Sequence, residues 1–231
     1  MQGRPDRVAA CFKILCDLGP HFGYFPEPEK YFAICPLATE DEVKAVFEAE
    51  GMTVKTCRGH RYVGGSVGSL AMRNRWIEPM VEEWVAGIEV LSKIARKFPQ
   101  TAYHGFATSL QAEWQYLCRC VPGVVRHLAP VEEAIKTLLI PALLELPVDH
   151  VQAELRMLLL HGIKAGGMNL RNPADGADRL FEASKEASGI LVTSLRDGTP
   201  LDSVAHRVQV RGAGAAARKD KAAMEKAAVI P

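Results

Sequence analysis

The chain has 231 residues, of which 48% are apolar and 24% charged, and its formal net charge is +1. This length suits one large domain or two small ones with a real core, and the composition excludes a disordered or fibrous protein. A near-neutral chain has no strong overall field for a polyanion, so any nucleic-acid binding must depend on local patches of charge.

The first seventy residues predict a small unit of helices and strands. Apolar residues at helical spacing predict a helix over 7–18, which Gly19-Pro20 ends. Residues 31–35 are expected to form a short buried strand. Thr39 is expected to cap a second helix, with Glu42 completing a capping box.

The stretch KTCRGHRYVGGSVGS, residues 55–69, has four glycines, three strong cations and no helical period. Two strands are expected, at 52–57 and 61–68. Arg58-Gly59-His60 has the length and composition of a tight turn between them. The sequence thus predicts a hairpin here, and an α+β unit over residues 1–70.

From residue 71 onward the apolar residues recur every three or four positions, which predicts a bundle of amphipathic helices. The expected helices are 71–98, 101–120, 130–146 with a bend at Pro141, 149–161, and one from Asn172-Pro173 to Leu195. The expected domains are 1–70, 71–200 and a tail at 201–231. Residues 202–231 hold six Lys or Arg against three Asp or Glu. The tail is therefore expected to be a basic solvated helix or a frayed extension.

Enzyme signatures are absent: no phosphate-binding loop, nucleophile elbow or zinc-protease motif occurs. Gly64, Gly65 and Gly68 only loosely resemble a phosphate loop. The pairs Glu82-Glu83 and Glu132-Glu133 are expected on solvated helix faces, because neighbours on a helix point about 100° apart.

Six cysteines occur, none in a C-x-x-C pair or at zinc-finger spacing. Cys118 and Cys120 permit a redox pair, but buried free thiols in a reducing compartment are the favoured interpretation. The N-terminus has no signal-peptide pattern, and the longest near-apolar run, 138–144, is too short to span a bilayer. An intracellular protein without a membrane partner is expected, in the nucleus or the cytoplasm.

Three segments carry a family resemblance through their order and spacing. They are LGPHFGYFPEPEKYFAIC, then GHRYVGGSVG, and then the helical region from FPQTAYH to IPAL, which AGGMNLRNPADGADRLFEASKEAS follows. Together, over roughly residues 11–195, the series resembles the C-terminal half of reverse transcriptases from eukaryotic retroelements, RNA-directed DNA polymerases that belong to the nucleotidyltransferases. The resemblance implies an incomplete palm-like sheet with two helices, followed by a helical thumb-like bundle.

The resemblance also implies site residues. Lys30 falls where the family has a lysine that protonates the departing pyrophosphate. The hairpin falls on the primer grip, where glycines let the backbone approach a sugar–phosphate chain closely. The implied nucleic-acid-binding residues are Lys55, Arg58, Arg61, Tyr62, Gly64 and Gly65.

The chain departs from the family where the chemistry should be. It has no Asp-Asp pair, and Asp6 and Asp17 lie where no metal-binding turn is predicted. Pro26, Pro28 and His161 also differ from the family pattern. The resemblance therefore implies a truncated fragment that begins after the catalytic turn, without a metal site or cofactor of its own. Mg²⁺ is expected only in a full-length relative.

The implied partners are an RNA–DNA or DNA template–primer, bound weakly, and the missing N-terminal half of the polymerase. One alternative is a helical protein-interaction module without a nucleic-acid role. Another is a small-molecule enzyme on an α+β fold. No nucleophile, base and orienting group can be assembled for it from the sequence.

Overall fold

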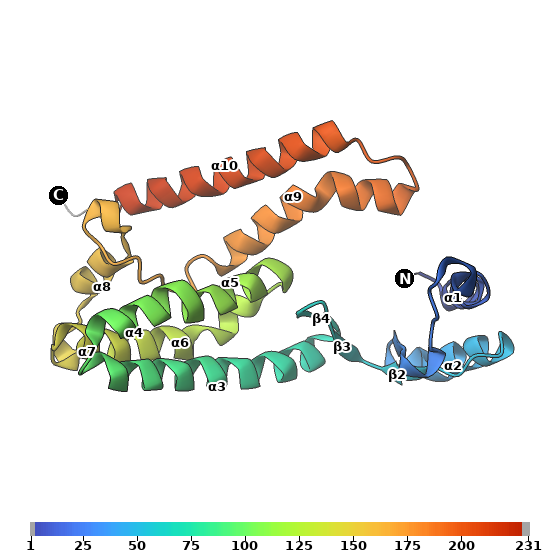
Figure 1. The fold of residues 1–231 in the computed structure, drawn as a ribbon, viewed down its shortest axis with the longest axis horizontal. Helices are drawn as coiled ribbons and strands as arrows, with labels where there is room; N and C mark the ends of the chain where they lie inside the picture. The colour runs from blue at the N-terminus through green and yellow to red at the C-terminus, as the bar shows by residue number, and fades with distance from the viewer. Residues whose placement is uncertain (1–2, 228–231) are drawn as a thin grey trace. The chain divides into compact units, whose positions relative to one another are not determined.

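The computed structural model describes residues 3–227, apart from the side chains of residues 221, 222 and 224–227. The chain is mostly helical with two small β-sheets, which confirms the expected α+β composition (Figure 1). It folds as two compact units, Met1–Trp76 and Ile77–Pro231, called here the N-terminal and the C-terminal unit.

The N-terminal unit is built around a β-α-β arrangement. Its elements are α1 (Pro5–Leu18), β1 (Phe32–Ile34), α2 (Glu40–Ala49), β2 (Lys55–Cys57), β3 (Gly59–Tyr62), β4 (Gly65–Gly68) and the start of α3 (Leu70–Ala95). Strands β1 and β2 pair in parallel, with Phe32 opposite Lys55, and α2 forms the connection between them.

A small core joins α1 and α2 to one face of this sheet. Val43 and Phe47 lie one turn apart on α2 and are buried with Ala9, Phe12 and Met52. The rings of Phe12 and Tyr31 meet edge to face, with 4.6 Å between their centroids.

The hairpin forms, but not from the strands that the sequence predicted. Strands β3 and β4 pair antiparallel around a two-residue turn, Val63-Gly64, whose φ angles are 46° and 76°. Two positive φ angles define the turn type that best matches the twist of two strands, and Gly64 adopts one without cost. The expected pairing of 52–57 with 61–68 is wrong, because β2 pairs with β1 instead.

Three local expectations are also wrong. The expected strand 31–35 is buried on one face only: Phe32 and Ile34 are exposed, whereas Tyr31, Ala33 and Cys35 pack against the core. Thr39 makes no capping box: its hydroxyl donates to the carbonyl of Pro36, because a 3₁₀ turn precedes α2. Asn172 does not cap the fifth predicted helix. Its side-chain oxygen accepts a hydrogen bond from the amide of Ala174 in a short turn, and the helix begins only at residue 177.

The C-terminal unit contains the rest of α3 and seven further helices of the described chain. They are α4 (Pro99–Gly105), α5 (Gln111–Cys120), α6 (Ala129–Ala134), α7 (Ile140–Leu144), α8 (Ala153–Leu160), α9 (Ala177–Asp197) and α10 (Ser203–Ala227). The π-helical segments Phe106–Leu110 and Ile135–Leu139 join α4 to α5 and α6 to α7. The second segment leads into α7, whose second residue is Pro141, where the sequence predicted a bend. Proline cannot supply the regular helical hydrogen bond, and π-helical turns are common at such irregularities.

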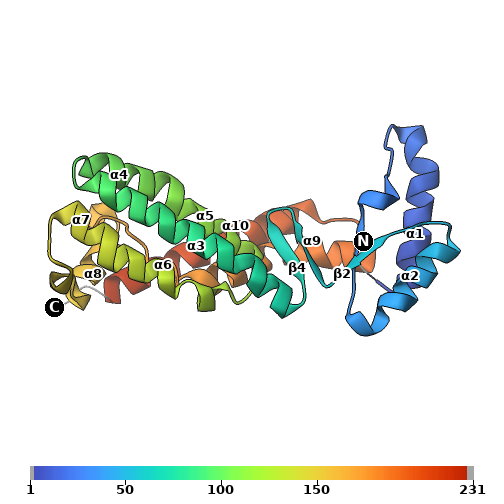
Figure 2. The ribbon, with the colours of Figure 1, turned by 90° about the horizontal axis from the view of Figure 1, so that it is seen from below.

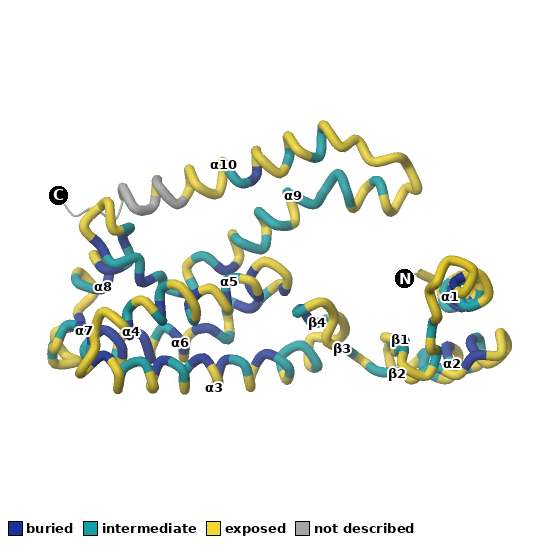
Figure 3. The backbone as a smooth tube through the Cα atoms, viewed as in Figure 1, coloured by how far each residue is buried: buried dark blue, intermediate teal, exposed yellow. Residues whose placement is uncertain are grey.

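Three helical rods, α3, α4–α5 and α6–α7, run side by side around the main core (Figures 1 and 2). The buried residues lie on their inner sides, as Figure 3 shows. Trp114 is central: its ring lies 5.9 Å from that of Trp84 and 5.8 Å from that of Phe106, between centroids. Both tryptophans are almost fully buried.

Helix α10 lies alongside α9, so most of the predicted tail is part of the C-terminal unit. The side-chain oxygen of Gln209 accepts a hydrogen bond from the amide of Ile190 at 2.9 Å, beside Gly189. Asp202 caps α10 by accepting from the amides of residues 204 and 205. Among the described helices, none is both long enough and apolar enough to cross a membrane.

Candidate nucleic-acid interface

The β3–β4 hairpin presents exposed polar and aromatic side chains on both of its faces. His60 stands opposite Val67, Arg61 opposite Ser66, and Tyr62 opposite Gly65. Because side chains alternate along a strand, His60 and Tyr62 project from one face and Arg61 from the other. Tyr62 is 69% exposed. The structure therefore places Arg61 and Tyr62, both predicted to bind nucleic acid, on opposite faces of the hairpin.

The glycines of the hairpin have structural roles of their own. Gly68 has φ 129°, and a Cβ there would lie 2.3 Å from the carbonyl oxygen of Arg58. A Cβ at Gly59 would lie 2.9 Å from Cβ of Met72, so the hairpin packs closely on the first turn of α3. Gly64 is required by the turn, and Gly65 is buried opposite Tyr62. Turn geometry alone thus accounts for Gly64.

A cluster of Phe32, Lys55 and His60 joins the two sheets. The rings of Phe32 and His60 stack with centroids 4.2 Å apart, and Nζ of Lys55 lies 5.9 Å from the centroid of the Phe32 ring. An exposed aromatic ring next to a lysine is typical of surfaces that stack bases and neutralise phosphates. Sequence reasoning missed Phe32, because it placed that residue in a buried strand.

Lys30 has no described contact with Phe32, Lys55 or His60. It ends a 3₁₀ turn, and its Nζ pairs with the carboxylate of Glu27 at 2.6 Å, with the side chain 74% exposed. The described contacts of Lys30 include neither a carboxylate cluster nor a hairpin residue. The structure thus leaves the predicted proton donor on a solvated surface.

The acidic residues near the N-terminus are paired with cations. Asp6 pairs with Arg4 and Asp17 with Lys13, each at 3.0 Å. Glu40 accepts hydrogen bonds from Lys44 at 2.6 Å and from Thr56 at 2.7 Å. These bonds, that of Lys44 first, lower the pKa of its carboxyl. Within residues 3–227, apart from the undescribed side chains, no group of three or more His, Cys, Asp or Glu side chains could hold a metal ion.

No protein-family model, curated protein or solved structure matches this chain. The comparisons therefore assign no family.

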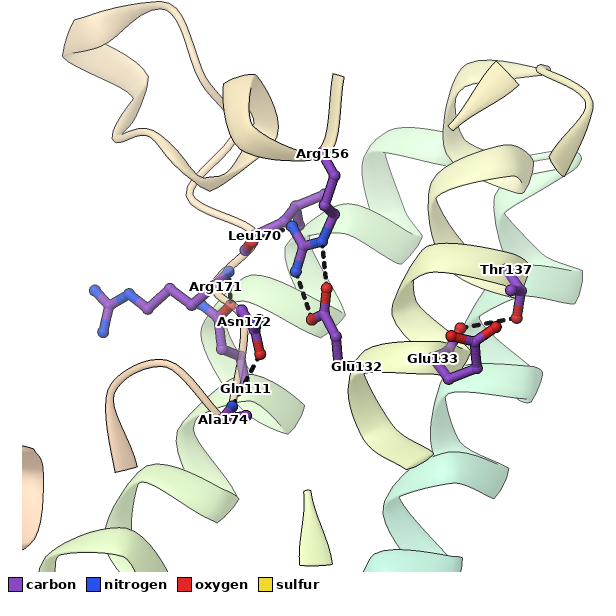
Figure 4. Close-up of polar contacts among 9 residues, drawn as sticks. All are labelled: Gln111, Glu132, Glu133, Thr137, Arg156, Leu170, Arg171, Asn172 and Ala174. Carbon is purple, nitrogen blue, oxygen red and sulfur yellow. Dashed lines mark hydrogen bonds and ion pairs between the residues drawn. The ribbon is translucent and has the colours of Figure 1, made fainter. Parts of the chain in front are cut away.

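The segment with the sequence GGMNLRNP is held in place by side chains of the C-terminal unit (Figure 4). Arg156 is only 6% exposed and forms a two-pronged ion pair with Glu132, at 2.6 and 2.7 Å, while its Nη1 donates to the carbonyl of Leu170. Gln111 accepts from the amide of Arg171 at 2.9 Å, and Tyr103 donates to the carbonyl of Met168. These contacts give the segment an architectural role.

The prediction of a solvated side chain is wrong for Glu132. Both members of the Glu132-Glu133 pair were expected on a solvated face, but the side chain of Glu132 is only 20% exposed and binds Arg156. Glu133 is exposed, as expected. The two differ because adjacent helical residues point in different directions, and only one of them meets α8.

The cysteines are free, and only Cys118 of the six is buried. Burial, together with the negative charge of Asp178, raises the pKa of the Cys118 thiol to about 11. Cys11 and Cys120 are exposed, so the expectation of buried thiols is wrong for them.

Three arginines of the predicted tail form a stripe along α10. Arg207, Arg211 and Arg218 are all exposed, and their spacing of four and seven residues places them on one side of the helix. This stripe is a second surface that could neutralise phosphates.

Proposed function

We propose that this chain is the palm-end and thumb portion of a retroelement reverse transcriptase, which binds a template–primer duplex and does not polymerise by itself. The observation that carries the proposal is the β3–β4 hairpin, whose exposed Arg61 and Tyr62 lie at the entry to the long helix α3. Lys55 lies on β2, and Arg58 lies at the bend between β2 and the hairpin.

The order of the elements supports the same proposal. A helix, a turn that contains Lys30, the β1-α2-β2 unit, the hairpin and a long helix follow one another, and the helical bundle comes last. The hairpin is packed against α3 through Gly59 and Met72, which fixes it at the base of that helix. A rigid hairpin can hold the backbone of a nucleic acid more precisely than a free loop can.

Polymerisation is not part of the proposal. Two-metal catalysis needs carboxylates that hold both ions near the primer end. Asp6 and Asp17 are taken up by neighbouring cations instead. We place the missing half of the polymerase on the outer face of the β1–β2 sheet, where Phe32 and Ile34 are exposed.

Val63, at the tip of the hairpin, has an unfavourable backbone conformation. This β-branched residue has φ 46°, a conformation that costs free energy, at the exposed tip of the hairpin. Strained residues that persist are concentrated at functional sites. The strain is consistent with a tip shaped for contact with a ligand.

The test is a binding titration of the full chain with a fluorescent RNA–DNA hybrid over a range of salt concentrations. We expect Lys55→Ala and Arg61→Ala each to weaken binding and to reduce the slope of log K against log salt by about 1, one phosphate contact each. Lys13→Ala is the matched control, because it removes a cation of the same unit that pairs with Asp17. Binding that ignores salt, or that Lys13→Ala weakens equally, would contradict the proposal.

A second candidate, a protein-interaction module, rests on apolar side chains of α9 and α10. Val192, Leu195, Val204 and Val208 are each more than half exposed. If this surface carries the function, Val204→Ser with Val208→Ser should abolish binding of one protein partner and leave the protein folded. Hybrid binding would then be absent from the wild-type chain as well.

A further inference from the structure

One face of the β3–β4 hairpin carries two exposed rings, and Arg61 projects from the other face. His60 and Tyr62 share this face because they lie two residues apart on β3, most of which is exposed (Figure 3). Tyr62 is 69% exposed, and among the described residues its side chain has no hydrogen-bond or ring partner. Its aromatic ring is therefore open to a ligand that stacks.

The ring of His60 is held in a fixed position. One of its faces stacks on Phe32 with centroids 4.2 Å apart, and its Nδ1 donates to the carbonyl of Arg61 at 2.7 Å. The other face of the imidazole has no described ring contact. Two residues of an antiparallel strand span roughly 6.8 Å, which is twice the rise of roughly 3.4 Å per base in stacked DNA. The spacing of His60 and Tyr62 thus leaves room for one base between their rings.

The charge beside these rings suits a nucleotide. Nζ of Lys55 lies 5.9 Å from the centroid of the Phe32 ring, and Lys55 forms no ion pair with the described side chains. Proteins bind single-stranded nucleic acids by stacking the open bases on aromatic rings and by neutralising the backbone with basic side chains. The bases of a duplex are paired and already stacked on one another, so only an unpaired base can enter this space.

We infer that the face with His60 and Tyr62 binds one unpaired nucleotide, with its base between the two rings, where Lys55 neutralises the adjoining backbone. Because it concerns the same hairpin, this binding rests on the proposed function. It names the part of the template–primer that this face holds, namely an unpaired nucleotide beside the duplex. Arg61 lies on the opposite face and remains available for the backbone of the duplex.

The test is a fluorescence titration of the full chain with a short thymidine oligonucleotide that carries one central 2-aminopurine. Stacking quenches 2-aminopurine, so we expect the chain to quench this single strand. Tyr62→Ala should abolish the quenching and weaken the binding at least about fivefold, as the loss of one stacked base predicts. Tyr62→Phe keeps the ring and should behave like the wild-type chain. Phe22→Ala is the control, because it removes another exposed ring of the same unit.

A blunt RNA–DNA hybrid, titrated in parallel, separates this binding from the proposed function. Tyr62→Ala should bind the hybrid with nearly the wild-type affinity, whereas Arg61→Ala should weaken it. No quenching by the wild-type chain, unchanged quenching in Tyr62→Ala, or an equal loss in Phe22→Ala would overturn the inference, while salt-dependent binding of the hybrid would leave the proposed function standing. Conversely, single-strand binding that requires Tyr62, without any binding of the hybrid, would support base stacking and contradict the proposed function.

Discussion

Arg156 joins three parts of the C-terminal unit. Its guanidinium binds Glu132 on α6 and the carbonyl of Leu170, and it comes itself from α8 (Figure 4). Removing one partner of such a pair leaves a buried charge without compensation, which is far costlier than losing a surface pair. The position of residues 161–174 should therefore depend on this ion pair.

We predict that Glu132→Ala lowers the free energy of unfolding by about 3 kcal/mol, because it strands the buried guanidinium. Glu133→Ala, one residue further along the same helix, removes an exposed carboxylate and should cost less than about 0.5 kcal/mol. Chemical denaturation of both variants measures the difference. Equal effects would show that the pair does not stabilise the fold.

Cys118 gives a pH dependence. Its pKa rises from 9.0 to about 11 on burial, so the folded chain holds the thiol proton more tightly than the unfolded chain. This stabilisation is complete below about pH 9, and it is lost as the pH rises toward 11, by at most ~3 kcal/mol. Unfolding titrations at pH 8 and 10.5 should show a fall in the free energy of unfolding that Cys118→Ala reduces and Cys11→Ala, at an exposed thiol, does not. An equal fall in all three proteins would contradict this account.

At the residue scale, the sequence predicts burial better than it predicts partners. The spacing of Val43 and Phe47, four residues apart on α2, is that of one buried helix face, and both lie in the core. The partner of Glu132 lies 24 residues away, and no local pattern indicates it. Phe32 was misplaced because a short apolar run looks the same whether one or both of its faces are covered.

At the element scale, the hairpin differs most from its prediction. The long helix α3 follows directly from its apolar period, although its bounds shift by a few residues. The pairing of β2 with β1 depends instead on a connection through α2, which the local sequence of β2 does not reveal. Because β2 pairs with β1, it is not a strand of the hairpin. The hairpin forms instead from β3 and β4, around the turn Val63-Gly64.

The strain at Val63 is testable. We predict that Val63→Asn raises the free energy of unfolding by about 1 kcal/mol, because asparagine tolerates positive φ and Asn-Gly is the preferred pair in this turn. If the tip contacts nucleic acid, the same variant should bind the hybrid more weakly despite its greater stability. Val67→Asn, an exposed change in strand β4, serves as the comparison. A lower free energy of unfolding for Val63→Asn would show that the backbone of Val63 is not strained.

At the scale of the whole molecule, the two units differ in how well they cover their apolar residues. The N-terminal unit has a small core and leaves many large apolar side chains exposed, among them Phe22, Phe25, Phe32 and Ile34. Its β1–β2 sheet has only two strands, and such a sheet offers open edges to other chains. This surface fits the proposal that another part of a polymerase covers it.

We predict that the isolated chain associates with itself as its concentration rises, and that Phe32→Lys with Ile34→Lys reduces this association. The charged side chains would block stacking on the outer face of the sheet. Val90→Lys, a change at an exposed apolar residue of α3, should have little effect. Sedimentation velocity over a range of concentrations measures both. A chain that stays monomeric without the substitutions would argue against an uncovered interface.

The central claim is that the β3–β4 hairpin touches the primer strand of a template–primer. The most direct measurement is photocross-linking of the full chain to an RNA–DNA hybrid with a photoreactive nucleotide at the primer 3′ end, followed by mapping of the cross-linked peptide. We predict cross-links within residues 55–68, which decline in Arg61→Ala and persist in Lys13→Ala. Cross-links confined to α10, or none at all at low salt, would contradict the account.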